Sequence, residues 1–235
     1  MTGIKQQVVG VASFKGGVGK TTTAIHLAAI LAKFGATILI DDDRNKSARE
    51  WAKAADEAGC SLPFEVVNSK QAPKHAANCR FIIIDSPAGT TPQEMGEMVE
   101  AVDFLVIPTF PDALCLSALF QTTQKAAEIR AVSHKQKLRD FCRVLFTRVM
   151  PHPNPDGAEA REILLQANIP MFTTQISQRS ALTRCALHGI LVEADRTPGG
   201  QIAAQEYEAA GKELVQLIAP EMVQPSKLNE VRKAA

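Results

Sequence analysis

Short, unbroken apolar runs alternate along the chain with longer stretches in which apolar residues recur every three or four positions. The unbroken runs are typical of strands buried on both faces of a sheet, and the longer stretches are typical of amphipathic helices. This alternation predicts an α/β fold with a doubly wound, mostly parallel sheet and right-handed crossovers. The expected strands are Val8–Ala12, Thr37–Ile40, Phe81–Ile84, Phe104–Ile107 and Val144–Phe146.

Helices are expected between these strands and near the end of the chain. Ser47 and Glu50 have the spacing of a capping box at the start of the second helix. An apolar stripe near the C-terminal end marks a helix that either packs on the sheet or lies on a membrane. The stripe contains no Trp or Phe anchor, which favours packing. The helical stretches are Thr21–Phe34, Ser47–Ala58, Ala113–Ala131 and Ala158–Ala167, and the stripe comprises Ala203, Tyr207, Ala210, Leu214 and Leu217.

Length and composition narrow the class of protein. A chain of 235 residues, 46% of them hydrophobic, fits one domain, which we expect to span residues 1–223 before a frayed tail at 224–235. No apolar run is long enough for a transmembrane helix and no signal peptide is recognisable, so we expect a cytoplasmic protein. The five cysteines have no metal-binding spacing and are expected to be free thiols. The net charge of +1 restricts any nucleic-acid contact to a local patch.

A glycine-rich segment separates the first strand from the first helix, and it reads Lys15-Gly16-Gly17-Val18-Gly19-Lys20-Thr21-Thr22. Glycines let backbone N–H groups converge on an anion, and the helix N-terminus adds its partial positive charge. In such a loop the lysine that opens the helix reaches the β- and γ-phosphates, and the next hydroxyl coordinates Mg²⁺. The segment therefore predicts an ATP and Mg²⁺ site, although Phe14 stands where an ordinary P-loop has glycine.

Carboxylates end two of the predicted strands, at the edge where ligands of such sheets bind. Asp41, Asp42 and Asp43 follow the second strand, and three adjacent carboxylates are costly without a cation nearby. Asp85 follows four large apolar residues, which is the Walker B pattern. Because Mg²⁺ keeps much of its hydration shell, we expect Asp85 to hold the ion through water.

The loop Lys-Gly-Gly-x-Gly-Lys-Thr resembles the deviant Walker A box of the ParA/MinD family of P-loop ATPases, of the SIMIBI type, and the resemblance extends along most of the chain. It implies that ATP joins two copies of the chain in a sandwich dimer, in which Lys15 reaches the partner's phosphates. It also implies that Asp41 positions or activates the attacking water and that Asp43 holds the loop. Gly89, after the Walker B strand, can turn its N–H toward the γ-phosphate and sense its loss. The catalytic set is then Lys15, Lys20 and Asp41. In this family the base pocket lies near Arg148, which either packs on adenine or faces solvent.

One segment departs from the family pattern. The family's second box continues its aspartates with Pro-Gln-Gly, and this chain has Arg44, Asn45 and Lys46 there. The rigidity of this loop, and with it the hydrolysis rate, is therefore in question.

The resemblance implies a slow, partner-stimulated ATPase that binds nucleoid DNA without sequence preference as an ATP-bound homodimer. Such a protein positions a plasmid, a chromosome region or a protein complex, and a ParB-like protein or a cargo adaptor stimulates it. Residues 125–148 hold seven basic side chains against two acidic ones, which form either a solvated helix face or a DNA-backbone patch. A MinD-like membrane-cycling ATPase and a metabolic enzyme of the same superfamily are the alternatives. No membrane contact is expected, because Lys227–Ala235 offers no large apolar anchor.

Overall fold

The computed structural model describes residues 6–132, 141–151 and 155–223. In this part of the chain, six strands form one sheet in the order β3-β2-β4-β1-β5-β6, and every neighbouring pair is parallel. The predicted doubly wound parallel sheet is therefore confirmed. The strands are β1 (Gln7–Val11), β2 (Thr37–Asp41), β3 (Glu65–Asn68), β4 (Phe81–Asp85), β5 (Phe104–Thr109) and β6 (Cys142–Phe146).

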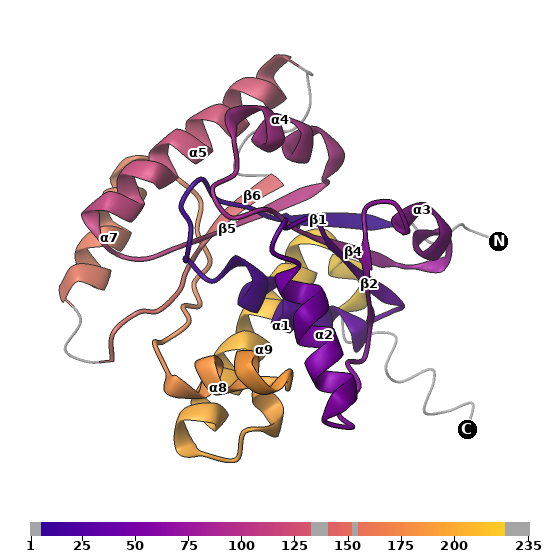
Figure 1. Ribbon diagram of the computed structural model, residues 1–235. Coiled ribbons are helices and arrows are strands. Elements are labelled where there is room, and N and C mark those ends of the chain that lie inside the picture. Colours follow the sequence, from indigo (N-terminus) through magenta and orange to yellow (C-terminus); the bar gives the residue numbers. More distant parts are fainter. Residues whose placement is uncertain (1–5, 133–140, 152–154, 224–235) are drawn as a thin grey trace.

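Helices cover both faces of the sheet (Figure 1). One face is covered by α1, against which α9 packs, with α2 and α8 beside them, and the opposite face is covered by α4, α5 and α7. The helices are α1 (Lys20–Ala32), α2 (Ser47–Glu57), α3 (Ala72–His75), α4 (Pro92–Ala101), α5 (Ala113–Val132), α7 (Pro155–Gln166), α8 (Ser180–His188) and α9 (Pro198–Ile218), with short 3₁₀ turns η1 (Ala76–Asn78), η2 (Val192–Ala194) and η3 (Pro220–Met222).

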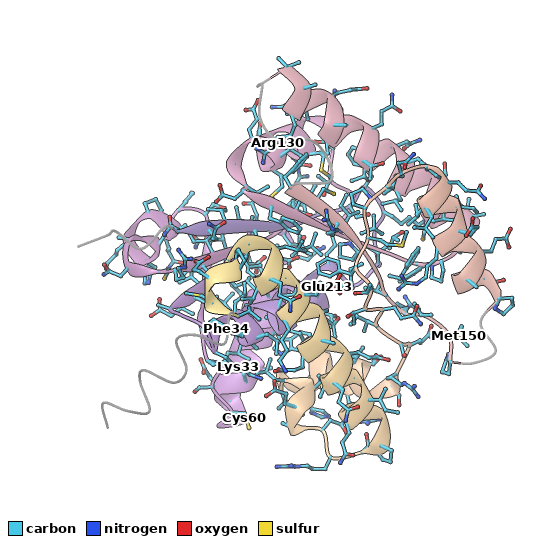
Figure 2. The ribbon with its side chains drawn as sticks, turned by 180° about the vertical axis from the view of Figure 1, so that it is seen from behind. Lys33, Phe34, Cys60, Arg130, Met150 and Glu213 are labelled. Carbon is cyan, nitrogen blue, oxygen red and sulfur yellow. The ribbon has the colours of Figure 1, made fainter. Side chains whose placement is uncertain are left out.

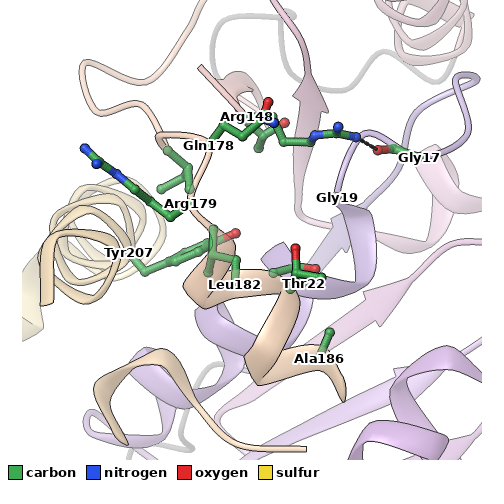
Figure 3. Close-up of a pocket in the computed structure, with 12 residues that line it drawn as sticks. Gly17, Gly19, Thr22, Arg148, Gln178, Arg179, Leu182, Ala186 and Tyr207 are labelled. Atoms are coloured by element: carbon green, nitrogen blue, oxygen red, sulfur yellow. Dashed lines mark hydrogen bonds between the residues drawn. The ribbon is translucent and has the colours of Figure 1, made fainter. Parts of the chain in front are cut away.

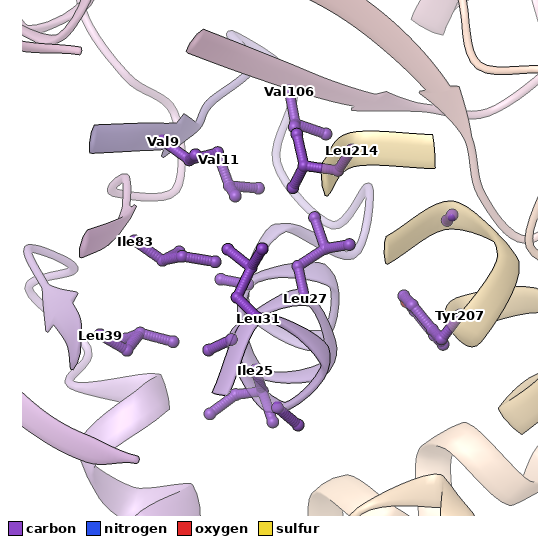
Figure 4. Close-up of a cluster of buried hydrophobic side chains, with 14 of the residues drawn as sticks. Val9, Val11, Ile25, Leu27, Leu31, Leu39, Ile83, Val106, Tyr207 and Leu214 are labelled. Atoms are coloured by element: carbon purple, nitrogen blue, oxygen red, sulfur yellow. The ribbon is translucent and has the colours of Figure 1, made fainter. Parts of the chain in front are cut away.

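Helix α1 is the centre of the larger hydrophobic core, as Figure 4 shows. Val9 and Val11 of β1 point from the sheet toward Leu27 and Leu31 of α1, and all four side chains are fully buried. On its far side α1 contacts α9 so closely that a Cβ on Gly211 would lie 2.4 Å from the Ile30 side chain. Because α1 is covered on both sides, it is apolar around most of its circumference.

The C-terminal apolar stripe packs inward, as its composition predicts. Ala203, Tyr207, Ala210 and Leu214 are at most 2% exposed, and Leu217 alone of the stripe is 37% exposed. At the end of α1, Lys33 (Figure 2) donates to Glu208 of α9 at 2.9 Å. Within the described residues, no helix combines the length and the apolarity needed to cross a bilayer.

Among the described helices and strands, β3, α3, α4 and α8 are absent from the sequence-based prediction. Strand β3 begins with the exposed Glu65 and contributes only two apolar residues, so it lacks the unbroken apolar run of its neighbours. Helix α4 begins with Pro92 and contains Gly96, which weaken the helical pattern. Helix α8 is only nine residues long.

The predicted capping box on α2 is wrong. The residue before the helix is Lys46, in the left-handed conformation with φ 58°, and it makes no side-chain cap. Ser47 instead donates its hydroxyl to Asp43 at 3.1 Å. A capping box does occur on α4, where Thr91 accepts from Glu94 N and Glu94 accepts from Thr91 N.

Some sequence-based expectations fall beyond the described ranges. The tail at 224–235 lies outside them, as do Lys135, Lys137 and Arg139 of the basic segment. The single domain at 1–223 stays a prediction. All five cysteines are free thiols, as expected.

Candidate functional site

The phosphate loop connects the end of β1 to the start of α1 and is open toward solvent. Gly17 and Gly19 have φ values of 76° and 82°, a region that side chains rarely adopt, and a Cβ on either would meet nothing within 4 Å. Val18 is buried and anchors the loop, because Thr147 of the β6 end donates to its carbonyl at 2.8 Å. The loop therefore presents its backbone to an open space at the helix N-terminus, where an anion is favoured.

Lys20 is the first residue of α1 and points back along the loop. Its Nζ donates to the carbonyl of Lys15 at 3.2 Å, and the residue is only 6% exposed. Burial lowers the pKa of Lys20, while the charges of Asp85 and Asp43 act in the opposite direction. Among the described residues this ammonium donates only to the Lys15 carbonyl, so it can donate further hydrogen bonds to phosphate oxygens. Lys15 is exposed.

Asp85 lies at the carboxyl end of β4, in register with Val11 of β1 and Asp41 of β2. It is fully buried, and neither carboxylate oxygen has a hydrogen-bond partner within the described chain. Burial raises the pKa of Asp85 to about 7, although the Thr21 hydroxyl and the Lys20 ammonium act in the opposite direction. A buried carboxylate with unused lone pairs beside a hydroxyl fits the oxygen-only ligand preference of Mg²⁺. Thr21 and Asp85 are therefore brought together as the sequence predicts.

Asp41 lies at the same edge, but its oxygens are already engaged. Its Oδ1 accepts from Asp43 N at 3.0 Å, and its Oδ2 accepts from Arg49 N at 3.0 Å and Arg49 Nε at 3.2 Å. The Asp41 side chain is fully buried. These contacts give Asp41 the role of holding the β2–α2 loop.

Asp43 is a second buried carboxylate of this loop. Burial lowers the pKa of Lys20, and the charge of Asp43 acts in the opposite direction after that of Asp85. Burial raises the pKa of Asp85, and the charges of both Asp41 and Asp43 act in the same direction. Asp43 accepts from Asn45 N and from Ser47 Oγ, each at 3.1 Å, which orients the side chain. Asp42 is exposed and accepts from Ser69 on the side of β3. The assignment of water activation to Asp41 stays a prediction, and Asp43 is the alternative residue for the same role.

A cavity of about 370 Å³ lies beside the phosphate loop (Figure 3). Its size is that of a small-ligand pocket, and its wall mixes apolar side chains with a few polar groups. The contributing elements are the phosphate loop, α1, the segment after β6, α8 and α9. The lining residues are Gly17, Gly19, Thr22, Thr147, Arg148, Ile176, Gln178, Arg179, Leu182, Thr183, Ala186 and Tyr207.

Arg148 forms the rim of this cavity. Its Nη1 donates to the carbonyl of Gly17 at 3.4 Å (Figure 3). Its guanidinium lies 4.4 Å from the centre of the Phe110 ring. The structure thus places Arg148 beside the phosphate loop. The residues of α8 and α9 in the wall were not predicted as site residues from the sequence.

His26 connects the phosphate-loop helix to the C-terminal elements. Val192 N donates to its Nε2 at 3.1 Å, so the ring proton sits on Nδ1, which donates to the carbonyl of Thr22 at 2.7 Å. The ring stacks on Tyr207 with centroids 4.4 Å apart and meets Trp51 edge-on at 5.8 Å. Burial lowers the pKa of His26 to about 4, so the ring is neutral near pH 7. A neutral histidine therefore fixes the α1 turn that carries Thr22 against the wall of the cavity.

Comparison with known proteins defines the family. Residues 9–192 match the model of the CobQ/CobB/MinD/ParA nucleotide binding domain, which covers the phosphate loop, both aspartate strands and most of the cavity. The chain belongs to this family, which confirms the prediction that it uses ATP and Mg²⁺. The individual site residues stay a prediction. Within the family the chain is a ParA/MinD-like ATPase.

Two relatives are similar to the chain in sequence, and one solved structure is similar to it in fold. It is 32% identical over 213 residues to Maintenance of carboxysome distribution protein A of Gloeobacter kilaueensis, covering 88% of this chain and 94% of that protein. It is 26% identical to Protein ParA of Rhizobium radiobacter, covering 84% and 90%. A putative plasmid partition protein of Borrelia burgdorferi B31 bound to AMPPNP has the same fold, with a TM-score of 0.70 and 17% identity over 91% of this chain and all of that one.

Proposed function

We propose that this protein is an ATPase that binds ATP with Mg²⁺, forms an ATP-dependent homodimer and positions a cargo on nucleoid DNA. The observation that carries the proposal is the arrangement at the carboxyl edge of the sheet. An open glycine loop, a buried lysine and an orphaned carboxylate beside a hydroxyl meet at the mouth of a cavity large enough for a nucleoside.

Each residue of the site has a proposed task. The backbone from Lys15 to Thr22 binds the phosphates, and Lys20 transfers its hydrogen bond from the Lys15 carbonyl to the β- and γ-phosphate oxygens. Thr21 and Asp85 would hold Mg²⁺, and the ion would supply positive charge beside the phosphates. Arg148 borders the base and ribose. The exposed Lys15 is free to serve as a cation for a second copy, as an arginine finger does in other phosphoryl transfers.

A carboxylate of the β2–α2 loop orients the attacking water. Asp41 is the residue implied by the family resemblance, and Asp43 is the second buried carboxylate of the loop. Asp41→Asn and Asp43→Asn distinguish the two. Loss of hydrolysis with normal ATP binding and intact folding identifies the water-positioning residue. The variant of the residue that mainly holds the loop should instead have a lower melting temperature than the parent.

The cargo and the DNA surface belong to the same proposal. The name of the Gloeobacter relative supports a protein assembly as cargo, and that of the Rhizobium relative supports a plasmid. A ParB-like protein or a cargo adaptor would stimulate hydrolysis. Of the basic segment, Arg130 (Figure 2) is only 4% exposed, donates to the Val102 carbonyl and lies 4.5 Å from the Phe141 ring centre. Arg130 therefore packs the interior, and Arg143 stays a candidate for DNA contact.

The test combines nucleotide titration with light scattering. The parent protein should bind Mg-ATP, become a dimer with ATP but not ADP, and bind a random DNA duplex only in that state. Lys15→Ala should keep ATP binding and lose the dimer. DNA binding should weaken steeply between 50 and 200 mM salt, because phosphate contacts release counterions. A parent protein that stays monomeric with ATP, or that binds anionic vesicles in place of DNA, would overturn the proposal.

A further inference from the structure

The loop that departs from the family pattern is tied to the neighbouring loop of the site. Arg44, in place of the family's proline, extends from the β2–α2 loop to the first turn of α4, and its Nη2 lies 3.0 Å from Glu94 Oε1. The other oxygen of Glu94 accepts from Thr91 N at 2.7 Å in the capping box. The N-terminal cap of α4 therefore orients Glu94 independently of its contact with Arg44.

The two loops joined in this way follow β2 and β4, the strands that end in Asp41 and Asp85. The β2–α2 loop carries Asp43, and the β4–α4 loop carries Gly89, which has φ 67° and is exposed. Among the described residues, a backbone bond from Asp42 N to Asp85 O at 3.1 Å ties these loops at the strand ends, and the Arg44–Glu94 pair ties them at the outer end.

A polar cavity of about 170 Å³ lies between these two ties. Asp43 and Asn45 line one side, Gly89 and Thr91 line the other, and Arg44 and Glu94 close the outer end. The volume has room for a few waters, each of which occupies about 30 Å³ in the liquid. The width of this cavity sets the distance between the carboxylate of Asp43 and the backbone of Gly89.

The hydrogen bonds of Asp43 do not fix this width. Asp43 accepts from Asn45 N and Ser47 Oγ, which belong to the same loop and the helix that follows it. Lys46 in the same loop has a left-handed backbone that non-glycine residues rarely adopt. An external tie at Arg44 therefore supplies the restraint that a proline would otherwise supply within the loop.

We propose that the Arg44–Glu94 ion pair is a strap that positions the Asp43 loop against the Gly89 loop for ATP hydrolysis. Arg44 and Glu94 are then positioning residues, and the inference rests on the proposed ATPase function. The pair is exposed on the Arg44 side, with 83% of that side chain accessible, so its effect is small and sensitive to salt.

The experiment measures kcat and KM for Mg-ATP in the parent protein, Arg44→Gln, Glu94→Gln and the double variant. Glutamine at 94 still accepts from Thr91 N, so α4 keeps its cap. Each single variant should lower kcat about two- to five-fold with KM unchanged, which corresponds to the energy of an exposed ion pair. The double variant should be no slower than either single variant, because both remove the same contact. Arg44→Lys should retain most of the activity.

Matched controls are Lys53→Gln on α2 and Glu100→Gln on α4, both exposed residues that lie away from the cavity. Their kcat should equal that of the parent, and the parent's kcat should fall with added salt more than that of the double variant. A lower melting temperature with unchanged kcat would show that the pair only stabilises the fold and would overturn the strap. Additive losses in the double variant, or a raised KM in Arg44→Gln alone, would also overturn it, the latter by showing that Arg44 contacts the nucleotide. Absence of hydrolysis in the parent protein would instead reject the ATPase function itself.

Discussion

His26 should make the protein less stable as the pH falls below 7. Its pKa is about 4 in the folded chain, because it is buried, and 6.5 in the unfolded chain. Between these values the unfolded chain binds a proton that the folded chain does not bind, so the free energy of unfolding falls with pH. For one group with these two pKa values, the loss between pH 7 and pH 5 is about 2 kcal/mol.

The assay is urea unfolding of the nucleotide-free protein at pH 7, 6 and 5, followed by tryptophan fluorescence. Trp51 is the single tryptophan of the chain and contacts the His26 ring, so its signal reports on this region. His26→Asn provides the reference, because its amide can still donate to the Thr22 carbonyl but does not titrate. Comparing the two proteins cancels the carboxyl groups that titrate in both.

The parent should be more stable than His26→Asn at pH 7, and this difference should shrink by about 2 kcal/mol at pH 5. His188→Gln, a change at an exposed histidine at the end of α8, should leave the pH dependence as it is in the parent. A difference that stays constant with pH would show that His26 titrates equally in both states. That result would refute its assignment as a buried neutral link.

Three further predictions concern single residues. Lys20→Ala should abolish Mg-ATP binding in a calorimetric titration; near-parental affinity would contradict the site. Asp85→Asn should remove the Mg²⁺ dependence of nucleotide binding. It should also make the nucleotide-free protein more stable at pH 8, because burial raises the pKa of Asp85 to about 7 and the parent therefore loses stability as the pH rises from about 4 through 7. Equal urea midpoints of the two proteins at pH 8 would refute this. Gly189→Ala should lower the free energy of unfolding by about 2–4 kcal/mol, since φ is 67° and the new Cβ would lie 2.2 Å from Ala55 N. Gly59→Ala has the same φ but no described atom near the new Cβ, so it should lose only about 1–2 kcal/mol through backbone strain. Similar losses in both variants would contradict the packing explanation.

The phosphate loop and the Walker B strand could be predicted because their chemistry is local. Glycines, the lysine that opens α1 and an aspartate after four apolar residues lie in continuous segments, and the structure brings Thr21 and Asp85 together as expected. The cavity wall could not be predicted, because Tyr207 reaches it only through the packing of α9 on α1. The hydrogen bonds from Arg49 to Asp41 could not be predicted either. The sequence of three adjacent aspartates does not show which carboxylate accepts from the backbone.

The double-sided burial of α1 has a consequence during protein synthesis. The helix ends at Ala32, but its outer cover, α9, ends only at Ile218, and β1 cannot pair until β4 and β5 have been made. At about 5–20 residues per second, the ribosome needs on the order of 10 s or more to add the intervening chain. During that time a mostly apolar helix has no permanent partner, so the nascent chain should depend on chaperones that hold exposed apolar segments. Truncation within α9 should likewise yield aggregates in place of a smaller folded protein.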